Sequence, residues 1–366
     1  MITGRKIILV LITALVIVGC SSSSDDGPSS KTDDFNRGAL LTNLVDNTII
    51  PAFEDLQVKL LALKANKDVF IVAPNQINLE ALRMSWIEAY KVWQSVEVFN
   101  IGKAEELQYS FQMNVYPTNV LDIENNISSG TYDLTNVNNN DAVGFPAVDY
   151  LLYGIGNDDM AILNKYLDIK YKNYLADVID QMASLTQIVL DDWKTVYRTT
   201  FVNSIANTAT SSLNKFVNDF IFYYEKGLRA NKIGIPAGNF STTPLPEKIE
   251  AFYNQDISKE LALEALNAVQ NLFNGKAYLS ATIGESFKSY LNHLDRNDLV
   301  GLINTRFDDA RQKIEALHDN FNIQINTDNT KMTQAFDALQ LTVVSLKVDM
   351  LQAFNVSVDF VDADGD

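Results

Sequence analysis

Two histidines, His293 and His318, are the only imidazole groups in this 366-residue chain. Imidazole is a common zinc ligand, and a zinc peptidase needs two or three protein ligands together with a general base. The usual arrangement for this chemistry, His-Glu-x-x-His on one helix face, does not occur in the sequence. Both histidines have polar neighbours and are expected near helix ends. A cation near the carboxyl end of a helix is favourable, so this position alone would explain them. A site made of the two stays open, but their number argues against zinc-dependent proteolysis.

Other motifs of catalysis or ion binding are weak. No Gly-x-Ser-x-Gly motif occurs, although a Ser–His–Asp triad assembled across the fold stays open. Residues 362–366 read Asp-Ala-Asp-Gly-Asp, which begins like a calcium-binding loop, but the bidentate glutamate of such a loop does not follow. We therefore expect a solvated tail or a cap at that end. Phosphate-binding and dinucleotide-binding motifs are absent from the sequence.

The single cysteine, Cys20, follows a short basic and apolar segment at the amino terminus. The apolar run over 7–18 is too short for a stable transmembrane helix. Residues 17–20, Ile-Val-Gly-Cys, resemble a bacterial lipobox, in which the cysteine thiol is acylated. Residues 1–20 are therefore predicted to be a lipoprotein signal peptide, and Cys20 the lipid anchor to the membrane. A plain signal peptide or an uncleaved anchor is the alternative.

Residues 21–34 form a tether rich in Ser, Asp, Gly and Pro, which we expect to be disordered. Within it, Ser-Asp-Asp over 24–26 is similar to the acidic export signal of bacterial surface lipoproteins. The same residues are equally consistent with a plain solvated linker. We expect an outer membrane lipoprotein whose folded part lies on the periplasmic or the cell-surface face.

The charge balance of the chain is strongly acidic. It has 29 Lys and Arg residues against 46 Asp and Glu residues, for a formal net charge of −17. This argues against nucleic acid as a partner and against electrostatic attachment to anionic lipid. Attraction for cations is compatible with it, although an acidic surface usually serves solvation alone. Hydrophobic residues make up 47% of the chain, which is enough for a large core.

Apolar residues recur at helical spacing almost throughout the chain. One such face consists of Leu79, Leu82, Trp86, Tyr90, Trp93 and Val96. Other helices are predicted over 35–63, 158–196, 203–232, 258–273, 295–318 and 330–353. Pro51 should kink the first of these or start a new helix. Strand-like alternation is limited to 355–361, and polar breaks occur at 125–141 and 234–246. We predict an all-α fold with little or no strand, in two helical-bundle halves of about 35–200 and 201–366.

The segment 144–154 reads Gly-Phe-Pro-Ala-Val-Asp-Tyr-Leu-Leu-Tyr-Gly. It resembles the signature of the imelysin family, Gly-x-His-x-x-Glu followed by Tyr-Leu-Leu-[Phe/Tyr]-Gly. The motif positions in this chain are Gly144, Phe145, Pro146, Asp149, Tyr150 and Gly154. Pro146 stands in place of the histidine and Asp149 in place of the glutamate. Because proline suits the first turn of a helix, we predict a helix start at Phe145-Pro146, with Asp149 one turn in.

Three further stretches resemble the same family. Trp86 to Gly102 follows the pattern of its early helix, with Glu97 at the glutamate position. Tyr116-Pro117 stands where a Trp-Pro pair is usual, and 232–238 is similar to the turn after the central long helix. The order and spacing of these stretches carry the resemblance over nearly the whole of residues 35–366.

The resemblance implies a mostly helical envelope protein connected with iron acquisition. The family's His and Glu, at i and i+3 on one helix face, can reach one cation. Here Asp149 and Glu97 would remain as the metal ligands, and two carboxylates suit iron or another hard cation such as Ca²⁺ or Mg²⁺ better than zinc. The alternative is that Asp149 caps or balances a helix terminus and Glu97 pairs with Lys or Arg.

We therefore predict an imelysin-like lipoprotein that binds without catalysis. Its partner would be a metal ion, a metal chelate or an envelope protein, held in the crevice between the helical halves. The alternative is a metallopeptidase of the imelysin family with altered ligands. A third hypothesis is a structural surface protein with a vestigial pocket.

Overall fold

Helices dominate the computed structural model, which describes residues 33–360. Residues 1–32 and 361–366 lie outside this range, so the structure does not test the signal peptide, Cys20 or the acidic end. No strand occurs within 33–360, where a single β-bridge joins Lys276 and Ile283. The predicted all-α fold class is confirmed.

Helices and helical turns follow one another along the chain from Arg37 to Phe354. The first are α1 (Arg37–Leu44), η1 (Val45–Ile49), α2 (Ile50–Val72), α3 (Gln76–Trp93), α4 (Lys103–Glu106), α5 (Tyr109–Met113), α6 (Val120–Ser129), η2 (Val137–Asn139), α7 (Gly144–Asp149), η3 (Tyr150–Gly154), α8 (Asp159–Lys165) and α9 (Ile169–Asp192). The next are η4 (Trp193–Tyr197), α10 (Arg198–Asn203), α11 (Ser212–Phe222), η5 (Tyr223–Gly234), α12 (Ile235–Ala237), η6 (Pro246–Lys248) and η7 (Gln255–Ile257). The last are α13 (Ser258–Asn274), α14 (Phe287–His293), α15 (Asn297–Glu315), α16 (Phe321–Val344), η8 (Ser345–Met350) and α17 (Leu351–Phe354).

Several of these elements begin or end where the sequence analysis expected. Pro51 lies in the first turn of α2, directly after the π-helical turn η1, so the predicted kink or new start is confirmed. The predicted apolar face of α3 is buried throughout, including Trp86, Tyr90 and Trp93. The side chain of Asn75 caps the start of α3 by accepting a hydrogen bond from the backbone amide of Asn78.

Parts of the structure differ from the prediction. The helix predicted over 203–232 begins only at Ser212, because residues 204–211 form bends and turns. The helix predicted from residue 330 does begin directly after a non-helical kink at Asp328, and a further helical segment that Asn320 caps precedes it from Phe321. The segment predicted to run from 158 to 196 is broken before Asp168, whose side chain caps α9 instead. The alternating segment near the carboxyl end is not a strand over 355–360, since it has no neighbouring strand with which to pair.

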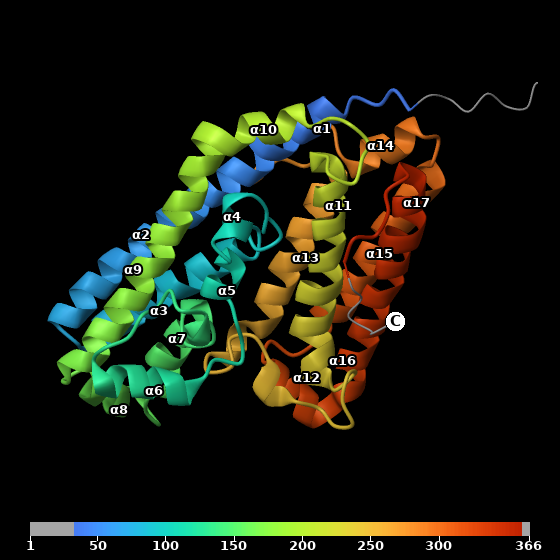
Figure 1. The fold of residues 1–366 in the computed structure, drawn as a ribbon. Coiled ribbons are helices and arrows are strands. Elements are labelled where there is room, and N and C mark those ends of the chain that lie inside the picture. The colour runs from blue at the N-terminus through green and yellow to red at the C-terminus, as the bar shows by residue number, and fades with distance from the viewer. Residues whose placement is uncertain (1–32, 361–366) are drawn as a thin grey trace, which may run out of the picture. The chain divides into compact units, whose positions relative to one another are not determined.

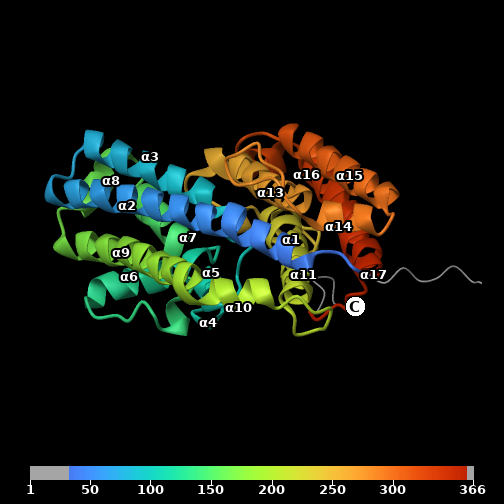
Figure 2. The same cartoon turned by 90° about the horizontal axis from the view of Figure 1, so that it is seen from above.

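The long helices pack in two groups. Helix α2 lies against α3 and α9, while α16 lies against α15 and η5, and α13 against α15. Figure 2 shows the same grouping from above, with α13 reaching the carboxyl end of α3. Residues from Phe35 onward form one compact unit. The predicted boundary between halves near residue 200 stays a prediction.

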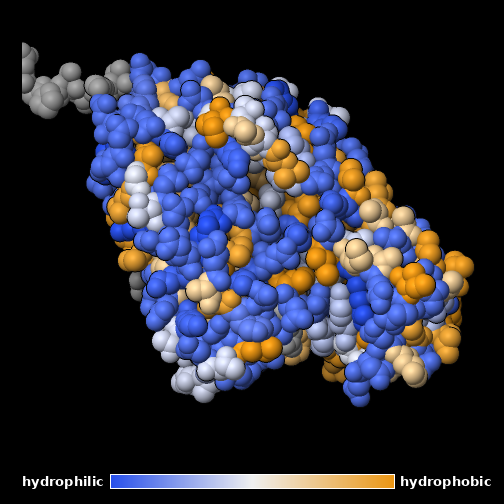
Figure 3. Space-filling model, turned by 180° about the vertical axis from the view of Figure 1, so that it is seen from behind, coloured by the Kyte–Doolittle hydropathy of each residue, from blue (hydrophilic) through white to orange (hydrophobic). Residues whose placement is uncertain are grey.

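The outer surface is largely hydrophilic, with separate apolar patches. Seen from behind, orange residues are frequent on the side where α2 and α3 lie (Figure 3). The exposed apolar side chains of these two helices include Val58, Leu61, Val69 and Met84. Within 33–360, no helix combines the length and the hydrophobicity needed to cross a membrane.

Candidate functional site

The signature segment forms the short helix α7 and the π-helical turn η3. Val143 is extended, and Gly144 then turns the chain with a φ of +74°. Pro146 occupies the first turn, where a missing amide hydrogen costs nothing. The predicted helix start is therefore confirmed, and Asp149 is the last residue of α7.

Helix α7 is fixed by its contacts with α3. The ring of Phe145 stacks on that of Tyr90 at 4.5 Å between centroids. The indole of Trp86 donates a hydrogen bond of 3.2 Å to the carbonyl oxygen of Phe145. Both aromatic residues of α3 were predicted as core, and these contacts explain why they also position the signature.

Asp149 is buried, with 1% of its surface exposed, and each oxygen of its carboxylate accepts a hydrogen bond from a backbone amide. Its two oxygens accept hydrogen bonds from the amides of Tyr253 at 2.8 Å and Asn254 at 2.9 Å. These amides belong to the loop over 249–254, which we call the strap. Asp149 thus ties the strap to α7 rather than balancing the start of its own helix.

A cavity of about 200 Å³ lies between α7 and the strap. We call it the signature cavity. It is lined by Tyr116, Pro117, Thr118, Pro146, Asp149, Glu247, Ile249, Ala251, Phe252 and Tyr253. At the position where the family signature has an imidazole, Pro146 presents a ring without a donor atom.

Burial raises the pKa of Asp149 to about 7, although the two amide hydrogen bonds oppose the shift. Since the unfolded value is about 3.9, the folded state binds this proton more tightly. The stabilisation from Asp149 is therefore fully present below about pH 4 and is lost as the pH rises through about 7.

Asp149→Asn tests this linkage. The substitution should cost about 1–3 kcal/mol at pH 5, because an amide group cannot accept from both backbone N–H groups. The free energies of unfolding of wild type and variant, measured by urea denaturation, should differ less at pH 8 than at pH 5. A difference that widens with pH would show that the carboxylate titrates in the opposite sense.

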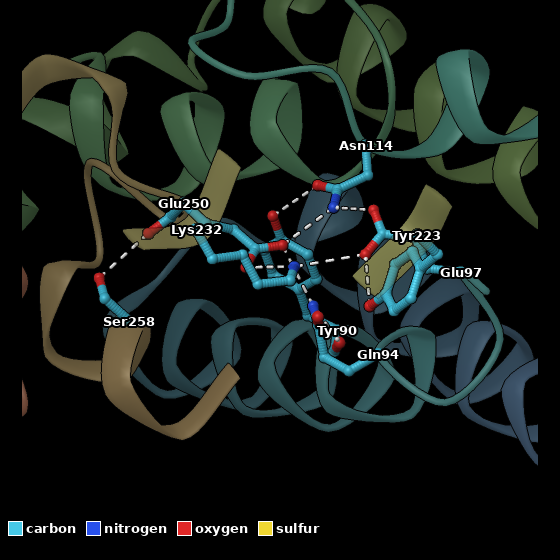
Figure 4. Close-up of polar contacts among 8 residues, drawn as sticks. All are labelled: Tyr90, Gln94, Glu97, Asn114, Tyr223, Lys232, Glu250 and Ser258. Carbon is cyan, nitrogen blue, oxygen red and sulfur yellow. Dashed lines mark hydrogen bonds and ion pairs between the residues drawn. The ribbon is translucent and has the colours of Figure 1, made fainter. Parts of the chain in front are cut away.

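The strap also carries Glu250 into a second buried group, drawn in Figure 4. We call this group the Lys232 cluster. It consists of Tyr90, Gln94, Glu97, Asn114, Tyr223, Lys232 and Glu250. The segments that supply it are α3 and the turn after it, the end of α5, the π-helix η5 and the strap.

Lys232 is the centre of the cluster. Its ammonium lies 2.7 Å from a carboxylate oxygen of Glu250 and 3.3 Å from one of Glu97. Burial alone would lower the pKa of Lys232, but the two carboxylates outweigh it and raise the pKa. The lysine therefore stays charged and holds two carboxylates together in a nearly closed interior.

Neutral donors satisfy the remaining oxygens of the two carboxylates. The amide of Asn114 donates to Glu97 at 2.8 Å and to Glu250 at 2.9 Å. Gln94 donates to Glu250 at 3.1 Å, and the Tyr223 hydroxyl donates to Glu97 at 3.2 Å. Burial, with help from the carboxylates, keeps the pKa of Tyr223 well above its ordinary value, so the phenol remains a donor.

The structure thus gives the two predicted metal ligands separate partners. Glu97 pairs with Lys232, as the alternative in the sequence analysis expected, and Asp149 binds the strap. No group of three or more His, Cys, Asp or Glu side chains within 33–360 is arranged to hold a metal ion. Binding of a metal through Asp149 and Glu97 stays a prediction.

Sequence reasoning missed Lys232, Glu250 and Asn114 as site residues. Lys232 lies in the stretch 232–238 that carried part of the family resemblance, which was the only available signal. Glu250 lies in a polar loop and Asn114 in an irregular turn, and neither belongs to a recognisable motif.

The sequence matches a family profile described as Imelysin (Peptidase_M75) over residues 49–350. The chain belongs to the imelysin family. This confirms the resemblance inferred from the signature. No functionally curated protein gives a significant match to the chain.

Two solved structures share the imelysin fold of this chain. One, from Psychrobacter arcticum 273-4, is described as an imelysin-like protein and is 16% identical. It superposes with a TM-score of 0.72 over 89% of this chain and 97% of its own. The other, from Parabacteroides distasonis ATCC 8503, is described as a candidate iron-regulated protein A precursor and is 18% identical. Its TM-score is 0.71 over 88% of this chain and 96% of its own.

Proposed function

We propose that this imelysin-family chain is a non-catalytic binding protein of the bacterial cell envelope that takes part in iron acquisition. The observation that carries the proposal is the state of the two signature carboxylates. Asp149 binds two backbone amides and Glu97 binds an ammonium, a phenol and an amide. That both carboxylates already have partners supports a structural role for them rather than a catalytic one.

The same contacts bear on the form in which iron would reach the protein. A bare cation at Glu97 would have to displace the ammonium of Lys232, which lies between two carboxylates. A metal chelate or a partner protein would not need to displace Lys232, because it would bind through its own surface groups rather than through direct coordination of the metal by Glu97. We therefore favour a chelate or an envelope protein over a free metal ion as the partner.

Two observations support the link to iron and to the envelope. A solved structure with the same fold is described as a candidate iron-regulated protein A precursor. The sequence around Cys20 resembles a lipobox, which would place the folded part at a membrane surface. The outer membrane remains the proposed location.

Growth of a deletion strain under iron limitation tests the proposed role. We expect slower growth than wild type in chelator-treated medium and equal growth when iron is added. The gene should restore growth, whereas Cys20→Ala should restore it only partly, because the anchor is lost. Normal growth of the deletion strain under iron limitation would contradict the role in iron acquisition.

Calorimetric titration of the purified protein tests the form of the cargo. Fe²⁺, Zn²⁺ and Ca²⁺ should give no saturable heat, because the signature carboxylates are already bonded. Saturable binding of one ion per chain that Glu97→Gln abolishes would show instead that the predicted metal site forms.

A further inference from the structure

A larger cavity, of about 440 Å³, opens beside the Lys232 cluster. Its size falls within the range of about 300–1,000 Å³ that small-molecule sites occupy. The turn after α3 and the segment through α4 and α5 supply one wall, and α11 with η5 supplies the other. In Figure 1, α4 and α5 face α11 at this place.

The lining of this cavity combines carboxylates with aromatic rings, so we call it the acid–aromatic cavity. Its carboxylates are Glu97, Glu105 and Asp219, and its aromatic residues are Phe111, Tyr116, Phe222 and Tyr223. Phe111 and Phe222 are 52% and 44% exposed, which is unusual for phenylalanine. Lys226 is the one cation among the lining residues, so negative charge is in excess.

Two carboxylates in this lining, Asp219 and Glu105, differ from Glu97 of the Lys232 cluster in having unused bonding capacity. Among the described residues, Asp219 and Glu105 accept no side-chain hydrogen bond and form no ion pair at the distance of a salt bridge. The side-chain oxygen of Asn100, also in the lining, is buried without a hydrogen-bond partner. Glu105 is exposed and Asp219 is half-buried, so water reaches both carboxylates, whereas the buried oxygen of Asn100 is unfavourable unless something in the cavity satisfies it.

The electrostatics around Asp219 also favour a cation. Burial raises the pKa of Asp219 to about 7, with further contributions from Asp359 and Glu105, while Lys215 opposes the shift. A positive ligand beside this carboxylate would relieve the repulsion among the acids. The cavity is also lined by aromatic rings, and such rings attract a positive charge placed over their faces.

We propose that the acid–aromatic cavity binds a small organic cation, an ammonium or guanidinium group joined to an apolar body. The charged end would contact Asp219, and the apolar body would lie against Phe111 and Phe222. This goes beyond the proposed function, since it assigns a ligand class without reference to iron. Binding by purified protein tests it, so its failure is distinct from that of the growth experiment.

The probes are tyramine, agmatine and spermidine, measured by isothermal titration calorimetry with the full mature chain. Tyrosol is the matched control for tyramine, because a hydroxyl replaces the amine on the same carbon skeleton. We expect saturable binding of at least one amine, and tyramine binding at least tenfold tighter than tyrosol.

Asp219→Asn is the matched variant, because it keeps the shape of a side chain that has no protein partner. It should weaken binding of the amine at least tenfold, whereas Asp309→Asn, an exposed acid on α15, should leave it unchanged. Thermal unfolding midpoints check that both variants fold. No binding of any of the three amines, equal binding of tyrosol, or an unaffected Asp219→Asn variant would each overturn the proposal.

Discussion

Lys232→Met should lower the free energy of unfolding by about 3–5 kcal/mol. Lys232 is 2% exposed, and its ammonium lies between the carboxylates of Glu97 and Glu250. Methionine fills a similar volume but leaves two negative charges close together in the interior. Removing one partner of a buried ionic group is costly, because the charge that remains is desolvated and has no counter-ion.

Urea denaturation at pH 7 measures this loss. Lys59→Met is the matched control, since Lys59 pairs with Glu88 at 3.1 Å and the two side chains are 33% and 53% exposed. That variant should lose less than about 1 kcal/mol. Adding Glu250→Gln to Lys232→Met should recover part of the stability, because it removes one of the two stranded charges. A loss below about 1 kcal/mol for Lys232→Met alone would mean that the cluster is not held by its lysine.

Gly144→Ala should destabilise the fold by about 3–5 kcal/mol. Gly144 has a φ of +74°, a backbone conformation that costs alanine about 1–2 kcal/mol. A Cβ atom there would also lie 2.2 Å from the carbonyl oxygen of Met113 and 2.9 Å from that of Gln112. Backbone atoms cannot move aside as a flexible side chain can, so α7 would have to shift away from α5.

Gly130→Ala separates the two causes. Gly130 has a φ of +67°, but nothing lies within 4 Å of the Cβ that alanine would add. Its loss should therefore be limited to the conformational cost of about 1–2 kcal/mol. Equal losses for the two variants in urea denaturation would show that α7 does not pack against α5 as closely as the structure has it.

Local features of the structure could be read from the sequence because local physics determines them. The apolar face of α3, the start of α2 at Pro51 and the start of α7 near Pro146 follow from helical periodicity and from the missing amide of proline. The family followed from the order of four short stretches. None of these inferences required knowing which distant segments meet.

The Lys232 cluster could not be predicted because its pairings are long-range. Periodicity shows which face of a helix is buried, but it does not show which charged residue of another segment faces it. From the sequence alone, a lysine and two glutamates in separate helices and loops would be predicted to lie on the solvated surface, where such residues are usually found. The strap is a similar case, since nothing in residues 249–254 indicates that their backbone amides bind Asp149.

The two pairings show what the signature carboxylate does in this chain. Where the family pattern has a histidine and a glutamate, this chain has Pro146 and Asp149. The Asp149 carboxylate accepts hydrogen bonds from the strap amides, and the strap in turn presents Glu250 to Lys232. Asp149 is therefore a positioning residue for the strap.

Proteolysis by the purified mature protein decides between this account and a metallopeptidase. Casein and an unfolded reporter protein would be incubated with wild type and Asp149→Asn, with Zn²⁺, Fe²⁺ or EDTA added. We predict no cleavage above that of a buffer control under any of these conditions. Cleavage that a metal ion supports, EDTA stops and Asp149→Asn abolishes while remaining folded would contradict it.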